Sequence, residues 1–182
     1  MQIYAPPTLS PGDRSRTIGL VALTILVVCL LGTSPVAAEN KIGGHFGIVL
    51  PLITELDGNT TDISDDFVIG FPTGITVHKS DRVAFDLEFV PILNDNPIDV
   101  DVVIHPGVLV KVGGSYTAGL RMAFEVDAQA WGFTPLIAKG FPLKGKNATY
   151  FIELDVPLRV VENELGESKT AVGLAFHTGI GF

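Results

Sequence analysis

The last thirteen residues, Thr170 to Phe182, alternate strictly between bulky and small side chains. The bulky positions are Val172, Leu174, Phe176, Thr178, Ile180 and Phe182. The positions between them hold only Ala, Gly and His177. Successive side chains of a β-strand point to opposite faces, so this pattern predicts a strand. An apolar outer face with a small inner face is typical of the wall of a narrow barrel in lipid.

Seven further segments show the same period of two, with turn-forming residues between them. The predicted strands cover residues 41–52, 66–78, 82–93, 100–111, 115–127, 130–141, 149–161 and 170–182. These lengths suit a tilted membrane crossing of about 9–11 residues with some overhang. An open sheet would leave backbone groups unpaired in hydrocarbon, so the strands must close on themselves. The sequence therefore predicts an all-β fold, an eight-stranded antiparallel up-and-down transmembrane β-barrel.

Residues 1–38 are predicted to be a cleaved signal peptide. Arg14 and Arg16 precede the uncharged apolar run from Ile18 to Leu31, which is too short to span a bilayer as a helix. Small residues at 36–38 place the cleavage before Glu39. An uncleaved N-terminal anchor is the alternative. The predicted domains are thus a leader, 1–38, and a barrel, 39–182.

Composition narrows the function classes. The formal net charge of −8 argues against nucleic-acid binding, which needs a basic face. The single cysteine, Cys29, lies in the predicted leader, so the barrel is expected to have no disulfide and no thiolate metal site.

Connection lengths and prolines refine the expected barrel. The connection of residues 53–65 is long and polar, whereas those at 79–81 and 112–114 are tight, which places the tight turns on the periplasmic side. Six prolines fall within or near the ends of predicted strands: Pro51, Pro72, Pro91, Pro106, Pro135 and Pro157. Proline cannot donate to a strand ladder, so we expect bulges or local breaks at these positions.

The second face of the predicted strands carries charges of both signs. Its main members are Arg82, Asp86, Glu88, Arg121, Glu125, Glu153, Asp155 and Arg159. If the apolar face meets lipid, these side chains point into a lumen barely wide enough to hold them. Charges confined at low dielectric must pair, so we expect an internal charge network. A gated path for a small polar solute is the functional alternative.

Candidate chemistry beyond this network is sparse. The histidines His45, His78, His105 and His177 share the inward parity, but their scattered spacing predicts no metal site and no cofactor. Ser80, Ser115 and Ser168 lie in predicted turns and form no nucleophile motif, so no catalytic residue is assigned and an enzyme is not expected. The loop carboxylates Asp57, Asp62 and Asp65 are a candidate site for divalent cations that bridge lipopolysaccharide phosphates.

With its terminal Phe182 after alternating apolar residues, the chain resembles small outer-membrane β-barrel proteins of the OmpA or OmpX type. The resemblance implies a monomer in the bacterial outer membrane with a structural or surface-interaction role. Its partners would be outer-membrane lipid, lipopolysaccharide and the barrel-assembly machinery, which would read Phe182 as an assembly signal. No peptidoglycan-binding domain follows the predicted barrel, so no cell-wall tether is expected. A narrow pore, an outer-membrane lipid-modifying enzyme and a soluble lipocalin-like carrier with its apolar face inward are the alternatives.

Overall fold

The structure is a computed structural model that describes residues 41–95, 98–126, 130–162 and 168–182. The predicted signal peptide lies outside these residues. The strands are β1 (Lys41–Leu56), β2 (Asn59–Asp62), β3 (Val68–Gly70), β4 (Thr73–His78), β5 (Val83–Asp95), β6 (Ile98–Gly113), β7 (Tyr116–Glu125), β8 (Ala130–Pro142), β9 (Thr149–Asp155), β10 (Leu158–Glu162) and β11 (Ser168–Gly181). No helix that could cross a membrane occurs in the described part of the chain.

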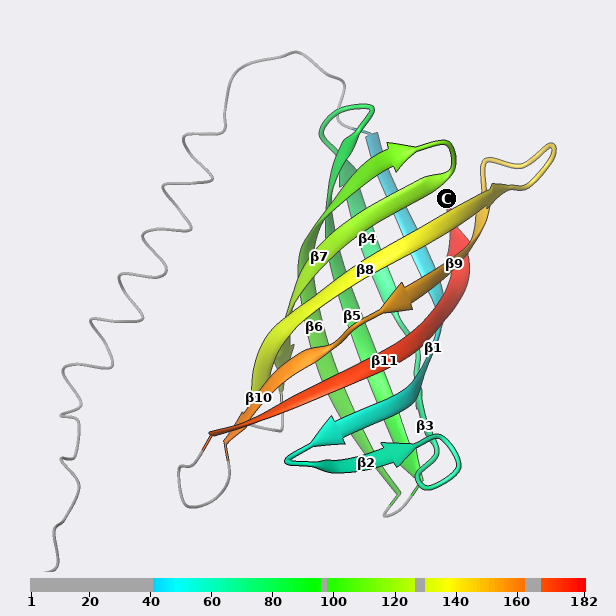
Figure 1. Ribbon diagram of the computed structural model, residues 1–182. Coiled ribbons are helices and arrows are strands. Elements are labelled where there is room, and N and C mark those ends of the chain that lie inside the picture. Colours follow the sequence, from blue (N-terminus) through cyan, green and yellow to red (C-terminus); the bar gives the residue numbers. More distant parts are fainter. Residues whose placement is uncertain (1–40, 96–97, 127–129, 163–167) are drawn as a thin grey trace, which may run out of the picture. The chain divides into compact units, whose positions relative to one another are not determined.

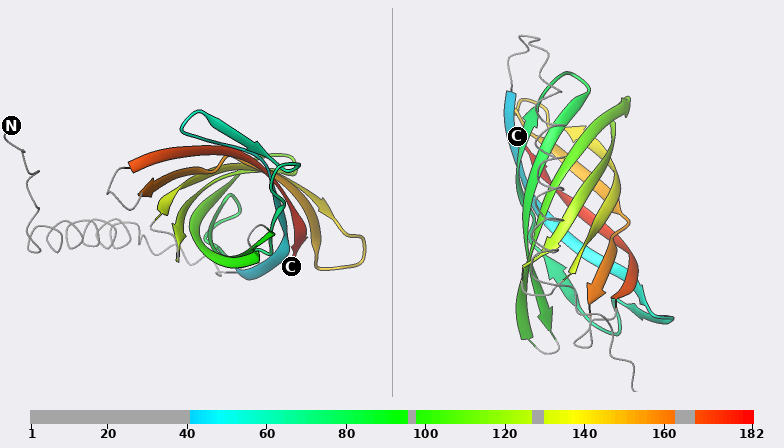
Figure 2. Two further views of the ribbon diagram at one scale, coloured as in Figure 1. Left: turned by 90° about the horizontal axis from the view of Figure 1, so that it is seen from below. Right: turned by 90° about the vertical axis from the view of Figure 1, so that its left-hand side faces the viewer.

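The strands close into a ring, as the views in Figure 1 and Figure 2 show. β3 and β4 pair with β1 and β5 in one continuous register, so together they form a single barrel strand interrupted at residues 71–72. β9 and β10 likewise form one barrel strand, interrupted at 156–157. All neighbours are antiparallel, and β1 pairs with β11 from His45↔Gly181 to Leu56↔Ala171 to close the ring. The predicted eight-stranded up-and-down barrel is confirmed.

β2 adds a hairpin to the end of β1, where the sequence predicted only a loop. Asp57 and Gly58 form its turn with φ values of 56° and 77°. Positive φ at both central residues is the requirement of a type I′ turn, which Asp-Gly favours. The hairpin continues the twist of β1, and Asn59–Asp62 pair back onto Ile53–Leu56.

The apolar face of the barrel points outward. Leu120 and Leu154 are 50% and 47% exposed, whereas their chain neighbours Arg121 and Glu153 are only 3% and 4% exposed. A soluble barrel would place the leucines inside and the charges in water. The lipocalin-like alternative is therefore wrong for this chain, and the outward face is the one suited to hydrocarbon.

The prolines are accommodated by a bulge and by breaks in the barrel strands. Leu52, next to Pro51, is bulged out of the β1–β11 ladder, and the β3–β4 and β9–β10 breaks contain Pro72 and Pro157. Pro91 and Pro135 instead lie within unbroken strands.

Each of these two prolines faces a break in the neighbouring strand. The carbonyl of Pro91 accepts a hydrogen bond from Phe71 N at 2.8 Å, and that of Pro135 accepts one from Val156 N at 2.9 Å. The N and C=O of a strand residue point to the same side, so the missing N–H of each proline also faces the break. Pro106 is likewise in an unbroken strand, at a position where the β6–β7 pairing skips from Ile104 to Gly107.

The two ends of the barrel differ. We call the end that holds the start of β1, Phe182 and the connections after β4, β6 and β8 the terminal end. The opposite end, with the β1–β2 hairpin, is the loop end. Aromatic side chains face outward near both ends. The rings of Phe141 and Tyr150 are in tilted contact at a centroid distance of 6.0 Å near the terminal end, and those of Trp131 and Phe133 meet edge-on at 6.1 Å near the loop end. Such paired rims are expected where rings sit at headgroup depth.

Candidate functional site

Buried charges from three separated barrel strands meet in the lumen. Asp86 and Glu88 come from β5, Arg121 from β7, and Glu153 and Asp155 from β9. Each occupies an inward position of an alternating strand, and each is at most 5% exposed. We call these five residues the lumenal network.

Arg121 lies at the centre of the lumenal network. Its Nε donates to Asp86 Oδ2 at 3.0 Å and its Nη1 to Glu153 Oε1 at 2.7 Å. Nη2 lies 3.7 Å from Glu88 Oε1. One guanidinium thus joins β7 to strands on both sides of the lumen. The planar fork of arginine can serve several carboxylates at once, which a lysine point charge cannot do in the same way.

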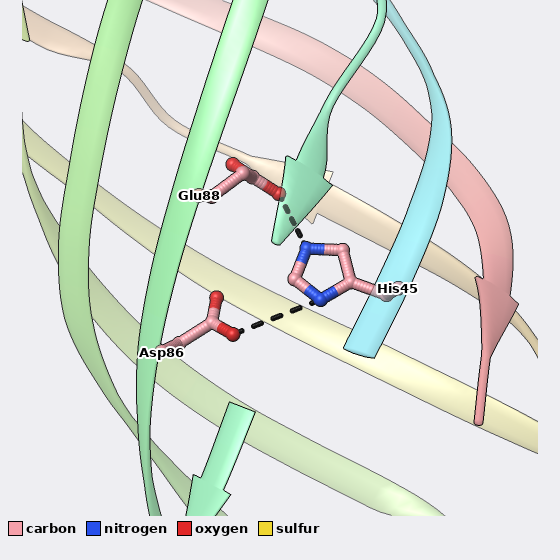
Figure 3. A group of neighbouring side chains, drawn as sticks. All are labelled: His45, Asp86 and Glu88. Carbon is pink, nitrogen blue, oxygen red and sulfur yellow. Dashed lines mark hydrogen bonds and ion pairs between the residues drawn. The ribbon is translucent and has the colours of Figure 1, made fainter. Parts of the chain in front are cut away.

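Figure 3 shows His45 of β1 lying between the two carboxylates of β5. Its Nε2 is 2.9 Å from Glu88 Oε1, and its Nδ1 is 3.7 Å from Asp86 Oδ1. The first distance is a hydrogen bond, whereas the second is longer than a hydrogen bond. The hydrogen bond between His45 and Glu88 therefore joins β1 to β5.

The imidazole of His45 reaches β5 because a glycine lies in between. His45, Gly74 and Glu88 are in register across β1, β4 and β5. A Cβ on Gly74 would lie 2.2 Å from Cε1 of His45, so any larger residue would displace the ring. Gly74 is thus the residue that lets this histidine cross a strand.

A second charged group continues the lumenal network toward the loop end. His105 Nδ1 lies 3.1 Å from Glu88 Oε2, and Arg159 Nη2 lies 3.2 Å from His105 Nε2. A guanidinium can only donate, so this Nε2 accepts and the ring of His105 is neutral. Arg159 also donates from Nε to Glu125 Oε1 at 3.2 Å. This pair is more exposed than the centre of the network.

An apolar layer closes the lumen on the loop side of the charges. Val90, Val103 and Ala123 are buried in mutual contact, with Val49 and Ile92 packed against them. Each of the first three residues is two positions from a polar lumenal residue, Glu88, His105 or Arg121, toward the loop end of its own strand. The lumen is therefore filled by a polar layer followed by an apolar one.

A cavity of about 500 Å³ lies on the other side of the charges, toward the terminal end. His45, Arg121 and Glu153 form part of its lining, together with Phe151 and Thr117. Lys111, near the end of β6, and Asn147, in the connection after β8, also line it. Solvent and small ions can thus approach the lumenal network from the terminal end.

The structure brings together most of the predicted lumenal residues. Asp86, Glu88, Arg121, Glu153 and Asp155 are in contact or close proximity, and His45, His105 and His177 each bond one of the glutamates. Arg159 and Glu125 form the more exposed pair. Arg82 is different: it lies exposed in the turn before β5 and outside the buried group.

Three lumenal positions were missed. The side chain of Thr76 donates to Asp86 Oδ1 at 2.8 Å, Gly74 gives His45 its path, and the ring of Phe151 meets that of His177 edge-on at a centroid distance of 5.0 Å. The signal was present for Phe151 and Thr76, because each shares the inward parity of its strand. The requirement for Gly74 depends on a neighbour 29 positions away and could not be found locally.

Each of the predicted loop carboxylates has a hydrogen-bond partner, for Asp62 and Asp65 within their own turn and for Asp57 on β11. Asp57 Oδ2 accepts from Lys169 Nζ at 2.6 Å, and Asp62 Oδ1 accepts from the hydroxyl and backbone N of Ser64. The Asp65 carboxylate accepts from Asp62 N at 3.0 Å. The hydroxyl of Ser80, one of the predicted turn serines, accepts from Val83 N at 3.0 Å.

Two groups of possible metal donors occur in the described part of the chain, and both lie in the lumen. One is His45, Asp86 and Glu88, and the other is Glu153, Asp155 and His177. In the first group the guanidinium of Arg121 and the hydroxyl of Thr76 already satisfy both oxygens of Asp86. The second group is less completely satisfied, because Asp155 Oδ1 and His177 Nε2 are buried without a hydrogen-bond partner.

No protein-family model and no curated protein sequence matches this chain. Three solved structures are similar in fold. The outer-membrane protein OprG of Pseudomonas aeruginosa has 12% identity and a TM-score of 0.40, and covers 77% of this chain and 93% of its own. A second structure is Ail, the attachment invasion locus protein of Yersinia pestis, in complex with the heparin analogue sucrose octasulfate. It has 8% identity and a TM-score of 0.39, and the match covers 80% of the present chain and 100% of Ail.

The third structure is a de novo designed transmembrane β-barrel with 15% identity and a TM-score of 0.33, covering 77% of this chain and 99% of its own. The class of the present protein is shown by its own strand pairing and exposed apolar face. It is an all-β, antiparallel, up-and-down barrel of eight strands with its charges enclosed.

Proposed function

We propose that this chain is a small bacterial outer-membrane β-barrel with a closed lumen and a structural or surface-interaction role. The observation that carries the proposal is the filled interior. The lumenal network and the apolar layer of Val90, Val103 and Ala123 occupy successive levels of the barrel. A barrel of eight strands has an interior that side chains can fill completely, so no wide solute path is left.

The outward face supports insertion into lipid. Large apolar side chains from every barrel strand are exposed, among them Phe46, Phe85, Leu120, Ile137 and Leu154. Contiguous exposed apolar surface of this extent is incompatible with a soluble monomer and marks contact with membrane or protein. Lipid and the acyl chains of lipopolysaccharide are the partners we assign to this face.

The last residue fits a role in assembly. Phe182 forms two backbone hydrogen bonds with Gly44, Gly44 N to Phe182 O at 2.8 Å and Phe182 N to Gly44 O at 2.9 Å. Its ring is 65% exposed and lies 6.4 Å from that of Phe46. The terminal residue is thus held in the ring-closing seam while its aromatic ring stays accessible, as recognition by an assembly machinery requires.

Membrane fractionation and single-channel recording test this function together. We expect the protein to require detergent for extraction from the outer membrane and to change its gel mobility on heating. In a planar bilayer the refolded barrel should give no conductance steps, because the lumenal network and the apolar layer block the path. The conductance is compared with that of the double variant Val90→Gly/Val103→Gly. This variant removes two side chains of the apolar layer and leaves every charge in place.

Each result has a definite meaning. Recovery in the periplasmic wash without detergent would refute a membrane barrel. Discrete conductance steps from the unaltered protein would instead establish the narrow pore and refute the closed lumen.

A further inference from the structure

The lumenal network is short of positive charge. Asp86, Glu88, Glu153 and Asp155 are buried carboxylates, and Arg121 is the guanidinium among them. His45 hydrogen-bonds Glu88 at 2.9 Å and lies 3.7 Å from Asp86. Arg159 is balanced by Glu125. The buried carboxylates therefore outnumber the guanidinium in a region of low dielectric, where unpaired charge is strongly unfavourable.

The missing charge can be located by asking which polar atoms lack partners. Both oxygens of Asp86 are bonded, by Thr76 and by Arg121, and both oxygens of Glu88 are bonded, by His45 and His105. In contrast, Asp155 Oδ1 and His177 Nε2 have no partner, although these residues are only 5% and 1% exposed. The polar atoms that lack partners therefore lie on the side of the lumen formed by β9 and β11.

These two residues form a donor group with Glu153. Glu153 and His177 are direct partners in the β9–β11 ladder, and His177 Nδ1 lies 2.9 Å from Glu153 Oε1. Asp155 is two positions along β9, opposite Ala175, whose small side chain leaves space beside it. One donor atom from each of the three residues lies within 4.8 Å of the other two.

We propose that Glu153, Asp155 and His177 bind one divalent cation of the Zn²⁺ class. Two carboxylates and one imidazole are donors that zinc accepts, and three protein ligands leave a position for water. The positive charge of such an ion would offset the carboxylates that Arg121 alone does not balance. The histidine spacing predicted no metal site, and the donors of this one come together only through strand pairing.

The cation has a route to the site. Glu153 lines the cavity that approaches the lumenal network from the terminal end, so an ion can reach its carboxylate without crossing the apolar layer. Arg121 Nη1 and His177 Nδ1 both bond Oε1 of Glu153. The neighbouring guanidinium is tolerated because the surrounding carboxylates outnumber it.

Metal analysis of the refolded full chain, prepared without a histidine tag, tests the site. The protein is folded in detergent with Zn²⁺, dialysed against excess Mg²⁺, and its bound zinc measured by mass spectrometry. We expect a single Zn²⁺ per chain. Asp155→Asn, which keeps the shape of the side chain, should weaken Zn²⁺ binding by more than the roughly 10–100-fold that loss of a second-shell partner costs.

The matched control is His105→Gln. His105 also bonds a glutamate through Nδ1, but its Nε2 is held by Arg159, so this variant should keep the zinc, whereas His177→Gln should lose it. Heat-dependent gel mobility confirms folding of each variant, and if Asp155→Asn does not fold, His177→Gln decides. Absence of zinc from the unaltered barrel, or equal zinc in His177→Gln and His105→Gln, would overturn the proposal and assign the missing charge to protons.

Discussion

At the scale of single residues, Arg121 is the buried charge of the described structure on which we expect the stability of the barrel to depend most. It is 3% exposed and bonds carboxylates on β5 and β9. Replacing a whole buried ion group by apolar residues is often neutral, but removing one partner leaves its counter-charges buried and unpaired. The stability of the barrel should therefore depend on this one side chain far more than on any exposed charge.

Arg121→Met should lower the free energy of unfolding by about 3–5 kcal/mol, because buried carboxylates lose their partner. Urea unfolding in micelles, followed by the fluorescence of the single tryptophan, Trp131, measures the change. Arg82→Met is the matched control: Arg82 is exposed in a turn, so its loss should change stability by no more than about 0.5 kcal/mol. Equal effects of the two substitutions would show that the lumenal network contributes nothing.

At the scale of elements, two breaks in the barrel strands and the turn after β2 each have a local cause. The β3–β4 and β9–β10 breaks face prolines of the neighbouring strands, so each pair of prolines shares one gap in the ladder. The connection after β2 is held by its own side chains. The hydroxyl of Ser64 donates to Asp62 Oδ1 at 2.6 Å and its backbone N donates to the same oxygen at 2.7 Å.

These bonds predict a pH-dependent turn. The Ser64 hydroxyl, and then its amide, lower the pKa of the Asp62 carboxyl from its ordinary value of 3.8, because both donate to the charged form. The turn should therefore be intact above that value and should loosen as the pH falls through the lowered pKa. A carboxyl NMR titration should give Asp62 a midpoint below 3.8, and Ser64→Ala should raise it. A midpoint unchanged by Ser64→Ala would contradict this account.

At the scale of the whole molecule, the orientation of the sheet decides the environment. Leu120 lies midway along β7 on the outward face and is 50% exposed. In water, an exposed leucine on a strand can be replaced by arginine at little cost. In lipid, the same change places a charge in hydrocarbon.

Leu120→Arg should therefore destabilise the barrel in lipid vesicles by about 2–4 kcal/mol, the cost of a cationic side chain at the bilayer midplane. Reversible urea unfolding in vesicles measures this value, with Lys111→Arg, exposed near the terminal end of β6, as the control. A change of less than about 0.5 kcal/mol for Leu120→Arg, typical of an ordinary surface site, would show that this face does not meet hydrocarbon.

The sequence by itself determined the fold class, the number of barrel strands and the inward parity of the charges. The reason is that a period of two is a local property: once Thr170 to Phe182 is a strand, the faces of Phe176 and His177 are set. The same parity brought Asp86, Arg121 and Glu153 to the inside. The bulge in β1 was expected from Pro51, because proline cannot donate to a ladder. That the bulged residue is Leu52 is seen only in the pairing of β1 with β11.

Only the tertiary structure decided which lumenal residues meet. Arg121 reaches carboxylates more than thirty positions away, and His45 reaches Glu88 across Gly74, because strand register sets the depth of each side chain along the barrel axis. Parity gives a side chain its face but not its depth. For that reason Arg82 and Arg121 looked alike in the sequence, whereas in the barrel one lies in an exposed turn and the other joins two strands across the lumen.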